Sequence, residues 1–245
     1  MFSLPNLLTL SNLLSGCIAL LMLVRGDIQS VTICIGLCLL FDFLDGLVAR
    51  LLRQHSEIGK ELDSLADMVS FGLLPGIMYY IMLLPEPASG VPDLSAIHLA
   101  ALPAFLVPLF SALRLAKFNT DQTQSEVFLG MPTPANTILT LGLLIAWGEH
   151  TAILHPLTHS SAFLYAILGI SSILLILPIP MLSLKSKNTS WKDNSMRYIL
   201  AAGSLSIFIL SGLAGLALII IFYLLLSALT FQNFTRNSTH KKSST

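Results

Sequence analysis

The sequence predicts an all-α membrane protein, a polytopic bundle of about eight transmembrane helices. Hydrophobic residues make up 54% of the 245 residues and charged residues only 11%. The mean hydropathy is +0.80, and the apolar residues form long blocks that match a bilayer core of about 30 Å. The formal net charge is zero, so nothing in the overall charge favours nucleic acid as a partner.

Six apolar blocks, each bounded by polar residues, glycine or proline, predict a core of six spanning helices. The first block lacks a basic leader and a small-residue cleavage site, so we interpret it as a retained helix and not as a cleaved signal. The six predicted helices are Pro5–Val24, Val31–Leu52, Leu62–Leu84, Ile97–Lys117, Thr133–Gly148 and Ser161–Ser183.

A seventh apolar block, Arg197–Leu229, is too long for one crossing. As a single helix it would measure about 50 Å, against a bilayer core of about 30 Å. We expect it to turn back at Ser211, Gly212 and Gly215 and to form a hairpin, although one long tilted helix is the alternative. The predicted organisation is a membrane core at residues 1–184, a C-terminal transmembrane hairpin at 185–232 and a disordered polar tail at 233–245.

The positions of lysine and arginine favour eight helices over seven, because cytoplasmic loops carry the positive excess. With eight helices and a cytoplasmic N-terminus only Arg25 lies outside, whereas seven helices would export the basic tail. We therefore expect an inner or plasma membrane protein with both termini and the functional site facing the cytoplasm. The basic residues then inside are Arg50, Arg53, Lys60, Arg114, Lys117, Lys185, Lys187, Lys192, Arg197, Arg236, Lys241 and Lys242.

Four aspartates interrupt the second and third predicted helices in the pattern D-x2-D-G-x2-A-R-x8-G-x3-D-x3-D. One carboxylate in the middle of a spanning helix costs about 2.5 to 3.5 kcal/mol, so four would oppose insertion by about 10 to 14 kcal/mol unless they are compensated. Hard oxygen ligands of this kind suit Mg²⁺ or Mn²⁺. The pattern therefore predicts a centre of two metal ions held by Asp42, Asp45, Asp63 and Asp67.

Helical spacing brings the two acid pairs together on facing antiparallel helices. The pair on the second helix shares its face with Gly46, Ala49 and Arg50. The two small residues leave room for a substrate, and the arginine offers a fork for phosphate oxygens.

Two alternative interpretations remain open at this point. The four carboxylates are also compatible with a cation-coupled transporter, although the chain has one motif and no evident internal repeat. In the predicted outer loop, His150, His155 and His159 suggest either a metal site or solvated loop residues, and we favour the second.

The run from Asp42 to Asp67 resembles the signature of the CDP-alcohol phosphotransferase family at every signature position. The resemblance implies a membrane enzyme, expected to be a homodimer, that transfers a phosphatidyl group from a CDP-linked lipid to an alcohol and releases CMP. It implies that Asp42 and Asp63 bridge two Mg²⁺ or Mn²⁺ ions and that Asp45 completes the first. Asp67 would ligate the second ion and act as general base.

The resemblance also implies a set of residues that contact the CDP-lipid. The sequence Pro5-Asn6-x2-Thr9-x2-Asn12 is similar to a first-helix element that lines the nucleotide pocket, although it also fits an ordinary capped helix start. The implied contacts are Asn6, Thr9, Asn12, Gly46, Ala49, Arg50, Ser56 and Gly59.

Three further stretches, residues 63–75, 112–119 and 130–136, resemble the branch of the family that accepts L-serine, with a weaker similarity at 180–185. This implies that CDP-diacylglycerol and L-serine give phosphatidylserine. Arg114 is the first candidate to hold the serine carboxylate, and Lys117 and Asn119 are the second, although basic residues also mark cytoplasmic helix ends. Lys117 stands where this branch usually has arginine, and glycerol 3-phosphate or inositol phosphate is the alternative acceptor.

Overall fold

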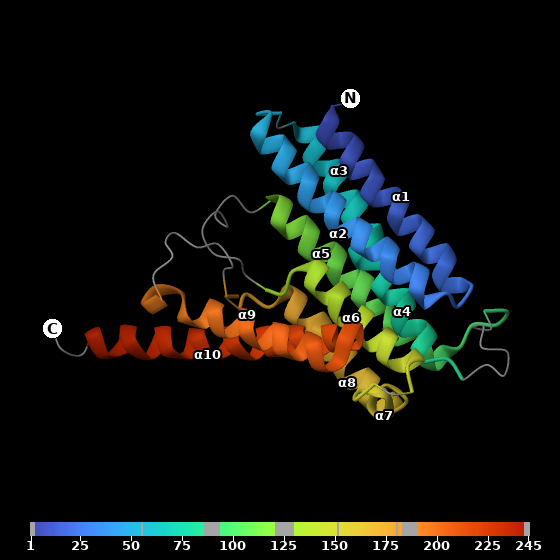
Figure 1. The fold of residues 1–245 in the computed structure, drawn as a ribbon. Helices are drawn as coiled ribbons and strands as arrows, with labels where there is room; N and C mark the ends of the chain where they lie inside the picture. The colour runs from blue at the N-terminus through green and yellow to red at the C-terminus, as the bar shows by residue number, and fades with distance from the viewer. Residues whose placement is uncertain are drawn as a thin grey trace.

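The computed structural model describes residues 3–54, 56–85, 94–120, 130–150, 152–179, 181–182 and 191–242. Every regular element in these ranges is a helix (Figure 1). The predicted all-α class is therefore confirmed. The weak similarity at 180–185 and the boundary between core and hairpin at 184/185 fall mainly outside the described residues.

The first two helices, α1 (Leu4–Val24) and α2 (Ile28–Leu51), form an antiparallel pair. Their starts are capped by side chains: Ser3 accepts a hydrogen bond from the backbone of α1, and Asp27 accepts one from the backbone of α2. The connection needs only a tight turn, in which Gly26 has a φ of 74°. α2 therefore begins three residues earlier than the hydrophobic pattern predicted.

The third predicted span is one continuous helical rod with three parts, α3 (Glu57–Asp67), the π-helix η1 (Met68–Leu73) and α4 (Leu74–Met82). It starts earlier than predicted because the side chain of Ser56 caps it. The π-helix was not predicted. It begins directly after Asp67, and π-helical turns occur frequently at functional sites.

The middle of the chain, in the residues that the structure describes, forms three helices of 15 or 16 residues and two shorter ones. The predicted span Ile97–Lys117 begins as a 3₁₀-helix because it contains Pro103, which cannot donate a backbone hydrogen bond. The helix that begins at Ser161 ends at Ile176, because Leu177 precedes Pro178 and a residue before proline avoids the helical region. The elements are η2 (Leu99–Phe105), α5 (Leu106–Thr120), α6 (Thr133–Gly148), α7 (His155–Thr158) and α8 (Ser161–Ile176).

The C-terminal block folds into the predicted hairpin, with α9 (Trp191–Ser211) and α10 (Leu216–Lys242) joined by the short 3₁₀-helix η3 (Gly212–Gly215). Gly212 has a φ of 56°, which reverses the chain. α9 and α10 lie side by side and cross the direction of α1 and α2 (Figure 1). The ring of Phe222 packs directly against Gly203, where a Cβ would overlap it, so the glycine allows this contact between α9 and α10.

α10 continues as a helix to Lys242, into the stretch 233–245 for which the sequence predicts disorder, and residues 243–245 lie outside the described residues. The sequence from Leu216 to Lys242 contains no glycine or proline that would end it. The proposed division into domains otherwise stays a prediction.

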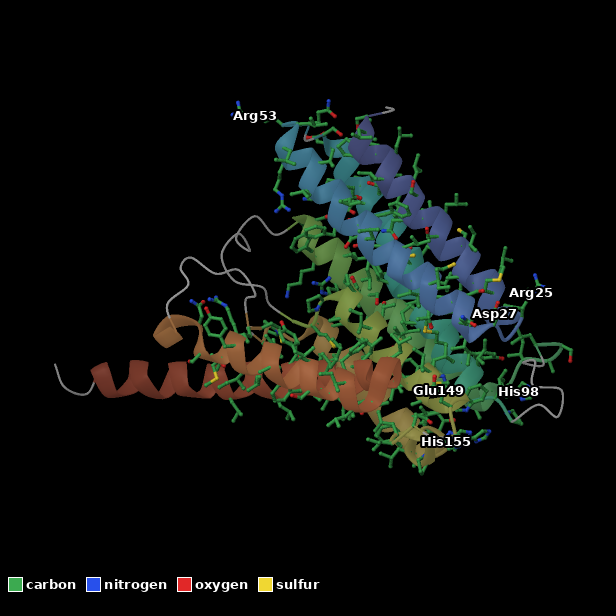
Figure 2. The ribbon with its side chains drawn as sticks, in the orientation of Figure 1. Arg25, Asp27, Arg53, His98, Glu149 and His155 are labelled. Carbon is green, nitrogen blue, oxygen red and sulfur yellow. The ribbon has the colours of Figure 1, made fainter. Side chains whose placement is uncertain are left out.

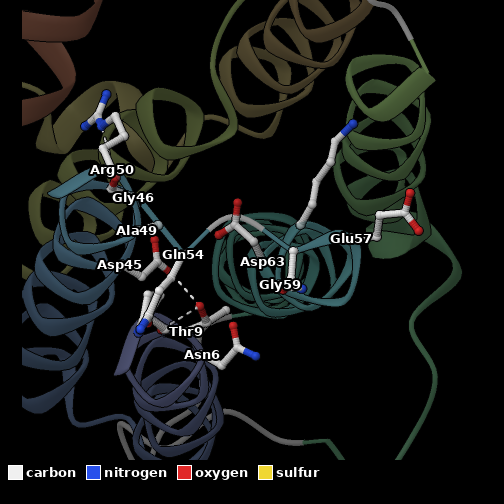
Figure 3. A pocket seen from close by; sticks show the side chains of 13 residues that line it. Asn6, Thr9, Asp45, Gly46, Ala49, Arg50, Gln54, Glu57, Gly59 and Asp63 are labelled. Carbon is white, nitrogen blue, oxygen red and sulfur yellow. Dashed lines mark hydrogen bonds between the residues drawn. The ribbon is translucent and has the colours of Figure 1, made fainter. Parts of the chain in front are cut away.

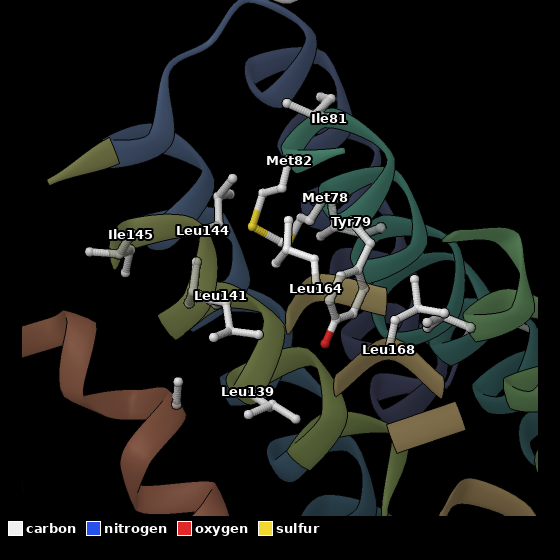
Figure 4. Packing of buried hydrophobic residues seen from close by; sticks show 14 of the residues in the cluster. Met78, Tyr79, Ile81, Met82, Leu139, Leu141, Leu144, Ile145, Leu164 and Leu168 are labelled. Atoms are coloured by element: carbon white, nitrogen blue, oxygen red, sulfur yellow. The ribbon is translucent and has the colours of Figure 1, made fainter. Parts of the chain in front are cut away.

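Most of the largest buried side chains lie where α4, α6 and α8 meet (Figure 4). Met78 and Tyr79 from α4 pack with Leu144 from α6 and with Leu164 and Leu168 from α8, all of them nearly inaccessible. This core packs around α4, the C-terminal part of the helical rod, whose N-terminal part α3 carries Asp67.

Several helices of this chain are apolar and long enough to cross a membrane, as expected for an integral membrane protein. Figure 2 shows Arg25, Asp27, Glu149 and His155 at one end of the molecule and Arg53 at the other, consistent with the alternation of loops that the sequence predicts. In the described residues these stretches are Leu4–Val24, Ile28–Leu51, Glu57–Met82, Leu99–Thr120 and Asn194–Thr230, the last of which contains the hairpin turn.

Candidate functional site

Three aspartates from two helices converge at the centre of the site. Asp42 comes from α2, and Asp63 and Asp67 come from α3, and one carboxylate oxygen of each lies within 4.8 Å of the others. Asp67 is buried and the other two are half-buried. This is the one such acidic or histidine-containing group found among the described residues.

The chemistry of this group fits a hard divalent cation. Three carboxylates so close together repel one another in a medium of low dielectric constant unless positive charge is supplied. Oδ1 of Asp63 is buried and has no hydrogen-bond partner among the described residues. An unpartnered carboxylate oxygen beside two other carboxylates is a donor atom of the type that Mg²⁺ and Mn²⁺ prefer.

Asp45, the fourth predicted ligand, makes a different contact. It is 6% exposed, and its Oδ2 accepts a hydrogen bond of 2.6 Å from the hydroxyl of Thr9 on α1. It is not a member of the group of three carboxylates. Together with Asp63 it lines the main cavity, so both carboxylates border the space available to a ligand.

The main cavity has a volume of about 650 Å³ and lies between the N-terminal ends of α1 and α3 and the C-terminal end of α2 (Figure 3). Seven of the eight predicted CDP-lipid residues line it, as do Gln54, Glu57 and Lys60, which the sequence motif did not include. The predicted lining residues are Asn6, Thr9, Gly46, Ala49, Arg50, Ser56 and Gly59.

The floor of this cavity depends on a close contact between α1 and α3. A Cβ on Gly59 would lie 3.1 Å from Oδ1 of Asn6 and 3.0 Å from Oγ of Ser56. The same Ser56 hydroxyl accepts the backbone N–H of Gly59 at 3.0 Å and so caps α3. Gly59 and Ser56 therefore shape the cavity as well as line it.

Arg50 lies at the edge of the cavity and folds back on its own helix. Its Nε donates to the carbonyl oxygen of Gly46 at 3.0 Å, and its side chain is exposed. Figure 3 shows the guanidinium turned away from Asp63. The remaining guanidinium donors are placed where a phosphate could reach them from outside the carboxylate group.

Asn12, the eighth predicted CDP-lipid residue, is not one of the described residues that line the main cavity. Its Nδ2 instead donates to Oδ1 of Asp67 at 3.3 Å. The side chain is fully buried. The structure thus brings Asn12 to the carboxylate group and not to the space beside Asn6 and Thr9.

The residues predicted to bind the acceptor alcohol make two kinds of contact. Arg114 is half-buried, its Nη1 donates to Oγ1 of Thr133 at 3.5 Å, and it lines a small cavity of about 20 Å³ together with the exposed Lys117. Asn119 instead donates to the hydroxyl of Ser64 at 2.8 Å, and its carbonyl oxygen accepts from Lys60 at 2.6 Å. Asn119 therefore ties α5 to α3.

The histidines of the 149–160 segment contact one another at the opposite end of the molecule. Nδ1 of His150 is 3.1 Å from Nε2 of His155, and His159 bonds to the backbone of His155. In the part of the chain that the structure describes, their ring nitrogens do not form a three-ligand group. The metal interpretation of these residues gains no support.

Comparisons with known proteins identify related sequences. The model of a family described as CDP-alcohol phosphatidyltransferase matches residues 2–177, which include the carboxylate group and the main cavity. A CDP-diacylglycerol--serine O-phosphatidyltransferase of Bacillus subtilis is 35% identical over 131 residues, which cover 53% of this chain and 68% of that relative.

Two further relatives show similar identity over smaller parts of their length. A CDP-diacylglycerol--serine O-phosphatidyltransferase of Mycobacterium leprae is 34% identical over 148 residues, 58% of this chain and 46% of the relative. An archaetidylserine synthase of Methanothermobacter thermautotrophicus is 34% identical over 139 residues, 56% of this chain and 55% of the relative. The chain therefore spans about half the length of these two relatives.

Proposed function

This chain belongs to the CDP-alcohol phosphatidyltransferase family, and we propose that it transfers the phosphatidyl group of CDP-diacylglycerol to L-serine. The products are phosphatidylserine and CMP. The proposal extends to this chain the activity named for the Bacillus and Mycobacterium relatives. It also agrees with the archaeal relative, whose name differs in the lipid and keeps serine.

The observation that carries the proposal is the position of three convergent carboxylates beside a large cavity at one end of the bundle. Asp63 belongs to both features, since it is a member of the carboxylate group and lines the 650 Å³ cavity. When the CDP group of CDP-diacylglycerol is placed in this cavity, its pyrophosphate comes next to the carboxylates. Its lipid chains can extend along the apolar surfaces of the helices.

The residues of the chain account for the transfer step as follows. The serine hydroxyl oxygen forms a new bond to the phosphorus that carries the diacylglycerol, and the bond from that phosphorus to the oxygen of CMP breaks. Asp67 takes the hydroxyl proton as general base. Thr9 orients Asp45 at the nucleotide side, and Arg50 offers donors to phosphate oxygens.

Asp42, Asp63 and Asp67 are the residues that would hold Mg²⁺ or Mn²⁺, with Asp45 adjacent to them. Two such ions, when bound, neutralise the pyrophosphate and stabilise the charge on the leaving CMP. Burial of Asp67 keeps bulk water away from the hydroxyl that must react.

Acceptor recognition is assigned to the side of the carboxylate group where α5 packs against η1, beside the first residue of α6. Arg114 presents a buried Nε that has no hydrogen-bond partner among the described residues. A guanidinium in this position suits the carboxylate of L-serine. Lys117 adds positive charge nearby, whereas Asn119 supports the position of α5 against α3.

We further propose that the cavity and both termini face the cytoplasm and that the protein works as a homodimer. The orientation rests on the distribution of lysine and arginine. Reporters placed before Leu4 and after Lys242 should both be inaccessible from outside the cell. Light scattering in detergent should give the mass of two chains, and a monomer with full activity would contradict the dimer.

The function is tested with purified protein, CDP-diacylglycerol, Mn²⁺ or Mg²⁺ and a panel of alcohols, with CMP release as the readout. L-serine should give the highest kcat/KM and chelator should abolish turnover. A preference for glycerol 3-phosphate or inositol phosphate would contradict serine as acceptor and leave the transfer chemistry standing. Absence of CMP release with every alcohol would contradict the enzyme assignment.

A further inference from the structure

Asn12 on α1 is held rigidly against the carboxylate that acts as general base. Its Nδ2 donates to Oδ1 of Asp67 at 3.3 Å, which is the contact expected if Asp67 is ionised, because an ionised carboxylate only accepts hydrogen bonds. Its backbone oxygen accepts from the hydroxyl of Ser70 at 3.3 Å and from the thiol of Cys38 at 3.6 Å. Contacts from the rod and from α2 therefore hold this residue in place.

The other end of the Asn12 amide is unused. Asn12 is 0% exposed, and its Oδ1 is buried. This oxygen nevertheless accepts no hydrogen bond from any described residue. A buried carbonyl oxygen without a donor is unfavourable, and such atoms in native proteins call for a specific explanation. The nitrogen of the same amide group donates a hydrogen bond to Asp67, so this oxygen lies close to the proposed base.

The position of Asn12 along α1 separates it from the nucleotide side. Asn6 and Thr9 line the main cavity, and Asn12 follows them at the next interval of three residues, toward the membrane interior. At that depth its partner is Asp67 and not the cavity wall. A molecule that approaches Asp67 is therefore placed to supply a donor for Oδ1.

Building on the function proposed above, we propose that Asn12 recognises the ammonium group of the amino-alcohol acceptor through its free Oδ1. An ammonium group has three N–H donors and no acceptor, so it matches a lone carbonyl oxygen. In serine the ammonium and the hydroxyl are on adjacent carbon atoms. A hydroxyl placed at Asp67 thus brings the ammonium to the amide that is bonded to the same carboxylate.

This assignment completes recognition of a zwitterion from three directions. Arg114 supplies a guanidinium with an unpartnered, buried Nε for the carboxylate, Asp67 takes the hydroxyl proton, and Asn12 accepts from the ammonium. Arg114 and Asp67 are close enough for their charges to interact. An acceptor that carries phosphate in place of ammonium would leave Oδ1 of Asn12 without a donor, so the residue also acts against such acceptors.

The test compares Asn12→Ala and Asn12→Leu with the wild-type protein. The leucine variant removes both polar atoms and keeps the branched shape of the side chain. Since leucine is larger than asparagine and the position is fully buried, the alanine variant gives the same test without added volume. Ser15→Ala is the matched control, since Ser15 is also buried on α1 but its hydroxyl bonds only to the backbone of Ser11. Each protein is assayed for KM of L-serine, KM of CDP-diacylglycerol and competition by 3-hydroxypropionate, which is serine without the ammonium group.

Both Asn12 variants should raise the KM of serine about tenfold to a hundredfold, the effect of losing a hydrogen bond to a charged group. The KM of CDP-diacylglycerol should stay within twofold, and the preference for serine over 3-hydroxypropionate should fall at least tenfold. A lower kcat is also expected, because Asp67 loses a hydrogen bond. The Ser15→Ala protein should match the wild type.

Two results would overturn the inference. One is an increase in the KM of CDP-diacylglycerol with an unchanged KM of serine, which would put Asn12 at the nucleotide. The other is an unchanged preference for serine over 3-hydroxypropionate, which would leave Asn12 with a role in positioning Asp67 only. Failure of the wild-type protein to use serine at all would instead contradict the proposed function.

Discussion

The hydroxyl of Thr9 on α1 donates a hydrogen bond of 2.6 Å to Oδ2 of Asp45 on α2. Both residues are buried, with exposed fractions of 3% and 6%. The bond fixes one oxygen of a carboxylate that borders the main cavity and links the two helices across which a nucleotide would lie. α1 therefore takes part in the site through its side chains and not only as packing.

Thr9→Val should weaken binding of CDP-diacylglycerol, because valine keeps the shape of threonine and removes the hydroxyl. Loss of a hydrogen bond to a charged group costs about 1.5 to 3 kcal/mol, which corresponds to about a tenfold to hundredfold increase in the KM of CDP-diacylglycerol. Ser11→Ala, which removes a hydroxyl bonded only to the backbone of Leu7, should have no such effect. Equal kinetics for the two variants would show that Asp45 does not need Thr9.

Asp42→Asn and Asp63→Asn should each abolish turnover and weaken metal binding, because each removes a charge from the group of three carboxylates. Bound Mn²⁺ can be counted by electron paramagnetic resonance, and CMP release gives the activity. Asp27→Asn is the control, since Asp27 is exposed and caps the start of α2 at the opposite end of the molecule. Full activity of either cluster variant in excess chelator would exclude the proposed metal centre.

Asp67→Asn should retain CDP-diacylglycerol and release CMP on the order of 10² to 10⁴ times more slowly, since general-base catalysis contributes factors of this size. Single-turnover rates and binding of the nucleotide lipid are measured separately. A variant with an unchanged rate constant and poor lipid binding would make Asp67 a ligand only. Asn12, which donates to Asp67 in the wild type, can still bond to the amide oxygen of the variant.

The helices and the carboxylate group were predictable because each depends on a short-range pattern. Apolar blocks of bilayer length predicted the helices, and the glycines near Gly212 predicted the hairpin reversal. Spacings of three and four residues predicted that Asp63 and Asp67 would share a face, and the structure brings both together with Asp42.

The features that sequence reasoning missed depend on contacts between distant segments. The π-helix after Asp67 leaves no distinct hydrophobic pattern, and it forms where Ser70 packs against Gly16 and bonds to the backbone of Asn12. The depth at which Asn12 meets Asp67 likewise depends on how α1 is placed against α3. The polar residues Gln54, Glu57 and Lys60 lie in and beside a loop whose path the motif does not fix.

Gly142→Ala should destabilise the attachment of the C-terminal hairpin to the core. A Cβ at this position would overlap the backbone nitrogen of Ala217 on α10, and a backbone atom cannot move aside as a side chain can. Overpacking of this kind costs about 1 to 3 kcal/mol, visible as a lower thermal midpoint in detergent. Gly169→Ala is the control, because nothing lies within 4 Å of its Cβ position, and it should be neutral or slightly stabilising.

Arg114→Ala should raise the KM of L-serine strongly and leave the KM of CDP-diacylglycerol nearly unchanged. Nε of Arg114 is buried without a partner among the described residues, and Nη1 makes only a long contact of 3.5 Å to Thr133, so the guanidinium retains donors for a carboxylate. Losing one charge-assisted contact should cost about 1.5 to 3 kcal/mol, or about tenfold to a hundredfold in kcat/KM.

The comparison that makes this last prediction decisive is with Lys117 and Arg25. Lys117→Ala should have a smaller effect than Arg114→Ala, because Lys117 is exposed and its charge is screened by water and salt. Arg25→Ala removes an exposed charge at the opposite end and should leave both KM values unchanged. If Arg114→Ala kept wild-type kinetics with serine, or if the wild type preferred glycerol 3-phosphate in direct competition, serine recognition at Arg114 would be wrong. The phosphatidyl transfer chemistry would still stand, since it depends on the separate carboxylate group of Asp42, Asp63 and Asp67.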